Sequence, residues 1–79
     1  MFKNINADGT RNICGRHINA LRKSLHLSQR ALADKLQLAG IDLSKNAIQQ
    51  IESGERFVTD IELQAFAKLF STTADALLK

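Results

Sequence analysis

The sequence of 79 residues contains no proline, tryptophan or tyrosine, only four glycines and a single cysteine. Without a second cysteine the chain cannot form an internal disulfide, and a lone thiol is typical of a reducing compartment. Proline and glycine interrupt helices. Their scarcity, together with 44% hydrophobic residues, predicts a single small all-α domain with an aliphatic core.

Other absences narrow the function. No apolar run approaches the roughly 18 residues of a membrane-spanning helix, and the N-terminus lacks a signal-peptide core, so we expect a cytoplasmic protein without membrane contact. The motifs of nucleotide, serine and zinc hydrolases are missing, so we expect no enzyme. Cys14, His17 and His26 include no second cysteine pair, and Cys14 is better explained as a small core residue. We therefore predict neither a metal nor a cofactor.

The positive charge is concentrated in the first part of the chain. Residues 1–45 hold eight Lys or Arg against three Asp or Glu, whereas residues 46–79 hold three against five, which gives +5 and −2 out of a net +3. This asymmetry indicates a basic face that attracts a polyanion, although many small basic domains carry such charge for solubility alone.

Apolar periodicity predicts helices after an N-terminal arm at residues 1–12, which contains the turn signal Asp8-Gly9. A first helix is predicted over residues 14–25 by a stripe of apolar residues at helical spacing: Cys14, Ile18, Leu21 and Leu25. The next helix has Leu32 and Leu36 on its inner face. The fourth has an inner face of Leu63, Phe66, Ala67 and Phe70.

Start and stop signals delimit four of the five predicted helices. Ser28, Ser44 and Thr73 are N-capping residues, whereas Thr59 and Glu62 form a capping box. Gly40 and Gly54 can adopt the positive φ that ends a helix, which closes the second helix at Gly40 and the third, residues 45–53, at Gly54.

The third helix has an unusual outer face. At about 100° per residue, Ala47, Ile48 and Ile51 face inward. The opposite side has no carboxylate before Glu52. It carries three amides, one lysine and one serine: Lys45, Asn46, Gln49, Gln50 and Ser53. Amides are less soluble than charged groups but can both donate and accept hydrogen bonds.

The run "LRKSLHLSQRALADKL…AIQQIESGERFVTDIELQAFAKLFSTTADALL" resembles the helix-turn-helix domain of the XRE-like family, the phage Cro and repressor type. The resemblance covers roughly residues 13–78 and is most specific at Leu27-Ser28-Gln29 and at Ile51-Glu52-x-Gly54. It implies a five-helix, lambda-repressor-like domain at residues 13–79, preceded by the arm. In that family the second and third helices form the motif, and the third enters the major groove of DNA.

The resemblance also implies roles for particular residues. The base-contacting residues would be Lys45, Asn46, Gln49 and Gln50. An amide matches N6 and N7 of adenine and a lysine matches the acceptors of guanine, whereas a carboxylate would be repelled by phosphate. The residues contacting the DNA backbone would be Ser28, Gln29, Ser44 and Arg56. The alternative is an ordinary solvated helix face.

One segment departs from the family pattern. Twelve positions separate Leu36 from Ile48, whereas a turn of about three or four residues normally joins these helices. The stretch "QLAGIDL" makes either a longer second helix or an extended turn, beneath which Ile41 and Leu43 could pack. The tilt of the third helix depends on this segment.

An ion pair between Arg22 and Glu52 is expected at a helix junction. Arg22 flanks the inner stripe of the first helix, and Glu52 lies about 40° from Ile48 around the third helix. The resemblance implies the same pair. The alternative is two exposed charges.

Together these features predict a sequence-specific regulator of transcription, a repressor, that binds an inverted-repeat site in double-stranded DNA. We expect a weak homodimer that becomes firm on DNA and uses Leu77 and Leu78, although Leu77 could equally close the core of the monomer. Without a second domain in this sequence, we expect no ligand sensing. An antitoxin-like or other protein–protein interaction module, controlled through a partner protein, is the alternative.

Overall fold

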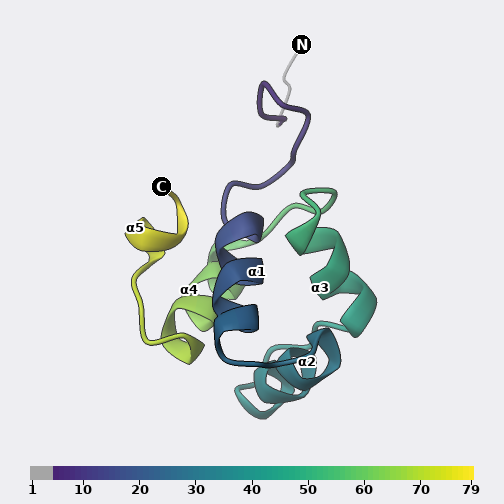
Figure 1. The fold of residues 1–79 in the computed structure, drawn as a ribbon, viewed down its shortest axis with the longest axis vertical. Coiled ribbons are helices and arrows are strands. Elements are labelled where there is room, and N and C mark those ends of the chain that lie inside the picture. Colours follow the sequence, from purple (N-terminus) through teal and green to yellow (C-terminus); the bar gives the residue numbers. More distant parts are fainter. Residues whose placement is uncertain (1–4) are drawn as a thin grey trace.

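The computed structural model describes residues 5–79, which form five helices and no strand (Figure 1). The helices are α1 (Gly15–Ser24), α2 (Gln29–Leu38), α3 (Lys45–Glu52), α4 (Asp60–Leu69) and α5 (Ala74–Leu77). The predicted all-α, five-helix fold is confirmed. Residues 1–4 of the predicted arm lie outside the described residues.

Side-chain caps start four of these helices, as the sequence predicts. The hydroxyl of Ser28 accepts a hydrogen bond from the Ala31 amide at 3.0 Å, and that of Ser44 accepts from the Ala47 amide at 3.1 Å. Thr59 and Glu62 exchange the two hydrogen bonds of a capping box, and Thr73 caps α5. These bonds satisfy amides that have no partner within the first turn of a helix.

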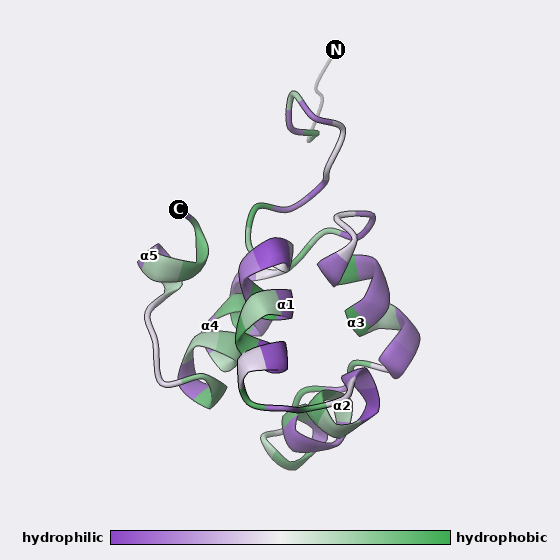
Figure 2. Ribbon diagram, in the orientation of Figure 1, coloured by the Kyte–Doolittle hydropathy of each residue, from purple (hydrophilic) through white to green (hydrophobic). Residues whose placement is uncertain are grey.

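The core lies where α3 packs against α1 and α2, with α4 and α5 closing it. The fully buried large side chains come from all five helices: Ile18, Leu32, Leu36, Ile48, Ile51, Phe66 and Leu77. Figure 2 shows the complementary pattern, with hydrophilic residues along the side of α3 that faces away from α1. Every helix within residues 5–79 is too short or too polar to cross a membrane.

One residue of the predicted apolar stripes, Leu25, is more exposed than expected. Leu25 is 52% exposed, because α1 ends at Ser24 and the chain turns back through His26, whose φ is +58°. The prediction that α1 extends to Leu25 as an inner residue is therefore wrong. Leu77 closes the monomer core at 1% exposure, whereas Leu78 is 45% exposed.

The connection between α2 and α3 is an extended turn and not a longer helix. α2 stops at Leu38, Gly40 adopts a φ of +87°, and the Ile41 amide donates to the Leu36 carbonyl at 2.9 Å. Leu43 is buried at 5% exposure, and Ile41 packs partly against the core. The additional residues are thus anchored by apolar contacts directly before α3 begins.

Candidate nucleic-acid interface

α3 presents its polar side chains to solvent and its isoleucines to the core. Ile48 and Ile51 are fully buried. The four residues predicted to contact bases are all exposed: Lys45, Asn46, Gln49 and Gln50. The structure therefore brings them together on one free surface that carries three amides, one ammonium group and no carboxylate.

The starts of α2 and α3 supply further polar groups. The capping side chains Ser28 and Ser44 are exposed, and each hydroxyl still has its own proton to donate. Gln29 is only partly exposed, because its side-chain amide donates to Oε1 of Glu52 at 3.1 Å. Its other amide proton stays free for a second acceptor.

Glu52 connects α3 to both preceding helices. Arg22 of α1 donates from Nε to Oε2 at 2.7 Å and from Nη2 to Oε1 at 3.0 Å. Asn19, one turn earlier, donates to the same Oε1 at 2.7 Å. The Arg22 and Glu52 side chains are only 11% and 4% exposed. One buried carboxylate therefore accepts hydrogen bonds from the middle of α1 and from the first residue of α2.

Burial alone would raise the pKa of Glu52, since it disfavours the charged form. The hydrogen bonds from Arg22, Asn19 and Gln29 outweigh that effect and hold the pKa of this carboxyl below its ordinary value. The same pairing raises the pKa of Arg22. Both groups are therefore charged at neutral pH, and the junction between α1, α2 and α3 is fixed by ionic hydrogen bonds.

Asn12 holds the C-terminal end of α3 against the start of α1. Its Nδ2 donates to the carbonyls of Ile51 at 3.0 Å and Arg56 at 2.8 Å, and its Oδ1 accepts from the Gly15 amide at 2.8 Å. The helices approach so closely that a Cβ at Gly15 would collide with the Ile51 carbonyl. The Arg11 amide also donates to the Gly54 carbonyl at 2.8 Å, so the end of the predicted arm packs beside the loop after α3 (Figure 1).

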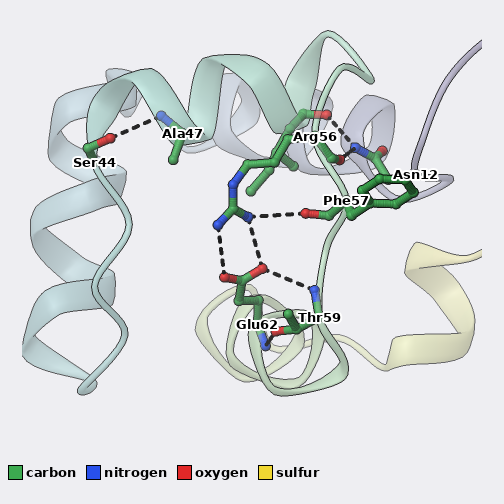
Figure 3. Close-up of polar contacts among 8 residues, drawn as sticks. Asn12, Ser44, Ala47, Arg56, Phe57, Thr59 and Glu62 are labelled. Carbon is green, nitrogen blue, oxygen red and sulfur yellow. Dashed lines mark hydrogen bonds and ion pairs between the residues drawn. The ribbon is translucent and has the colours of Figure 1, made fainter.

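Arg56 is turned toward α4. Figure 3 shows its guanidinium between Glu62 and the Phe57 carbonyl, which accepts from Nη1 at 3.1 Å. Nη1 lies 3.0 Å from Oε1 of Glu62, and Nη2 lies 3.4 Å from Oε2. Burial raises the pKa of Glu62, but Arg56 and the Thr59 amide lower it more. The Arg56 side chain remains 33% exposed, so one edge of it is available to a further anion.

Three of the residues that position this surface were missed in the sequence: Asn12, Gly15 and Asn19. Asn12 stands three residues before the helix start, where an N-capping side chain could have been suspected. Gly15 and Asn19 give no local signal, because each is explained only by a contact with α3, more than 30 residues later.

The predicted absence of a metal site concerns Cys14, His17 and His26. Cys14 is buried, which raises the pKa of its thiol. Among residues 5–79 no three His, Cys, Asp or Glu side chains are grouped so that they could hold a metal ion.

Comparison with protein families gives one match. The family model HTH_3, described as helix-turn-helix, matches residues 18–77. The match spans α1 from its fourth residue to the end of α5 and leaves out the arm and Asn12. No curated protein and no solved structure matches the chain.

Proposed function

Because the chain belongs to the XRE-like helix-turn-helix family, we propose that it reads a specific site in double-stranded DNA with α3 and represses transcription there. A domain of this family is in general a DNA-binding regulator of transcription. The observation that carries the specific proposal is the exposed, carboxylate-free face of α3. A protein that binds DNA in this way would be located in the cytoplasm, as expected from the sequence.

In this proposal α3 lies in the major groove. Asn46, Gln49 and Gln50 meet base edges, where each amide can pair with N6 and N7 of adenine, and Lys45 meets the acceptors of guanine. Glu52 and Asn12 support the proposal by fixing the C-terminal end of α3 to α1, since base readout needs a helix that does not move relative to its domain.

The DNA backbone is contacted from the two helix starts and from the loop after α3. Ser28, Gln29 and Ser44 supply hydroxyl and amide donors at helix N-termini, whose dipoles favour phosphate. Arg56 contributes through its exposed edge. Because Glu62 already neutralises much of this guanidinium, we expect Arg56 to affect affinity less than an unpaired arginine would.

We propose that two copies bind a two-fold symmetric site through one exposed apolar patch. Ile13, Phe57 and Leu78 line one hollow of about 240 Å³ and are 44%, 50% and 45% exposed. Exposed side chains of this size mark interaction surfaces when they are contiguous. The half-sites would lie about one helical turn apart.

The experiment is a base-by-base comparison of wild-type protein and Gln50→Ala on a site selected from random DNA. Loss of a bidentate amide contact should cost about 1–3 kcal/mol at one base pair and leave nonspecific binding unchanged. Gln37→Ala, an exposed amide of α2, is the matched control and should change nothing. Unaltered preferences for Gln50→Ala, Gln49→Ala and Asn46→Ala would reject α3 as the reading helix.

A protein–protein interaction module on the same fold is the alternative. Salt dependence distinguishes the two, because neutralising Z phosphates releases counterions and gives a log–log slope of about −0.9Z. Affinity for DNA that hardly varies with salt would favour the module.

A further inference from the structure

A second surface, unrelated to α3, lies between the end of α2 and α4. It is a groove of about 510 Å³. Leu38 of α2 is 90% exposed on it and Ile61 of α4 is 65% exposed. None of the residues assigned above to DNA or to the dimer lines it. Two large aliphatic side chains that are exposed together at one hollow indicate an interaction surface.

The charged side chains that line this groove are of one sign. Lys35 and Lys68 line it and are both exposed, the amide of Gln64 is the other polar side chain, and no carboxylate is among the lining residues. An apolar floor with cationic edges complements an apolar stripe flanked by carboxylates. A basic partner would be repelled by the two lysines. A nucleic acid would be attracted by them but would leave the aliphatic side chains of the groove without an apolar contact.

From this complementarity we propose that the groove binds an acidic amphipathic helix of a partner protein. Such a helix would place leucine-like side chains at helical spacing on Leu38 and Ile61 and its carboxylates near the two lysines. Pairing through a β-strand is not available here, since residues 5–79 contain no sheet edge. The proposal goes beyond DNA reading and does not depend on it.

The test uses two synthetic peptides of about 16 residues, long enough to form a helix. Both carry leucines at positions i, i+3 and i+7 and alanines at most other positions. The positions that flank the leucines are glutamates in one peptide and lysines in the other. Each is titrated into the isotope-labelled full chain while amide chemical shifts are followed. We expect the acidic peptide alone to bind, with shifts centred on Leu38 and Lys68.

Variants assign the binding to the groove. Leu38→Gln should weaken the acidic peptide about tenfold, whereas Leu25→Gln, which alters a half-exposed leucine outside the groove, should not. Replacing both lysines in Lys35→Glu/Lys68→Glu should transfer binding to the basic peptide. Circular dichroism of every variant should stay at the wild-type value. DNA affinity is compared for Leu38→Gln, which keeps the net charge of the chain, and should also stay at the wild-type value, so that a failure here is separate from a failure of DNA reading.

Three results would overturn the proposal. The first is binding of both peptides with equal affinity, or of neither. The second is a set of shifts centred on Phe57 and Leu78, which would assign the peptide to the dimer patch. The third is a concentration-dependent shift at the groove without peptide, which would identify a second copy of this chain as the occupant.

Discussion

Replacing Arg22 by alanine tests the buried junction of α1, α2 and α3. The substitution removes two hydrogen bonds to Glu52 and one, at 2.7 Å, to the Leu27 carbonyl. Glu52, whose side chain is 4% exposed beside Arg22, then keeps only the neutral donors of Asn19 and Gln29. A carboxylate stranded in this way is the costly outcome of breaking a buried pair.

We expect Arg22→Ala to lower the free energy of unfolding by about 3–5 kcal/mol. Each hydrogen bond to a charged group contributes on the order of 1.5–3 kcal/mol. The variant no longer has the desolvation cost of a buried guanidinium, which offsets part of the lost hydrogen-bond energy. A domain of this size has a total stability of roughly 4–12 kcal/mol, so the variant should lose a large part of its stability.

Urea denaturation at neutral pH measures this loss. Arg22→Lys should be intermediate, because an ammonium keeps the charge but cannot form the planar two-bond contact. Arg22→Ala in a Glu52→Gln background should cost less than in the wild type, since no buried charge is then stranded. Arg56→Ala is the matched control: that pair is more exposed, and its loss should be about 1 kcal/mol or less.

A loss for Arg22→Ala no larger than that for Arg56→Ala would contradict a stranded buried charge. An equal loss with and without the Glu52 charge would also contradict it, because the cost would then come from lost packing of the arginine stem. A change in the slope of the denaturation curve would point to altered compactness of the unfolded state.

Three further predictions concern Asn12, the paired carboxylates Glu52 and Glu62, and the exposed Leu78. Asn12→Ala should lower stability by about 1–3 kcal/mol, because two carbonyls and one amide lose their partner in a partly buried place; an unchanged urea midpoint would count against it. Glu52 and Glu62 have lowered pKa values in the folded protein. The stability that they contribute is therefore complete above the ordinary pKa of about 4.3 and is lost as the pH falls through their lower folded values. A free energy of unfolding that rises with acidification over this range would contradict this assignment. Leu78→Glu should abolish the two-protein complex on a selected site and leave the monomer folded, which gel-shift stoichiometry and circular dichroism measure; an unaffected two-protein complex would remove Leu78 from the interface.

The helices and the inner faces could be predicted because their signals are local. Ser44, three residues before the amide it caps, and the Thr59–Glu62 pair act within one turn. Alternation of buried and exposed positions along a helix is likewise set by its pitch. Leu25 was mispredicted because periodicity does not register where the chain leaves the helix, and that point is fixed by backbone hydrogen bonds from His26 and Leu27.

The contacts that position the site were mostly not predictable, because they join distant segments. Asn12 and Asn19 are ordinary polar residues in the sequence and acquire their roles only when α3 returns to α1. The ion pair of Arg56 was likewise not predictable from the sequence. The resemblance implies a contact of Arg56 with the DNA backbone, but nothing in the sequence indicates that its guanidinium pairs with Glu62, a residue of the capping box of α4.

The long connection before α3 does not loosen the helix that we propose reads DNA, since both ends of α3 are held. At its start, Leu43 is buried and Ser44 caps the first turn. At its end, Glu52 accepts hydrogen bonds from three side chains. Asn12 donates a hydrogen bond to the Ile51 carbonyl, and this bond would break if the carbonyl moved. Loop closure entropy grows slowly with length, so the additional residues between α2 and Leu43 cost little. The insertion therefore changes the surface ahead of α3 and leaves the orientation of its polar face to the contacts with α1 and α2.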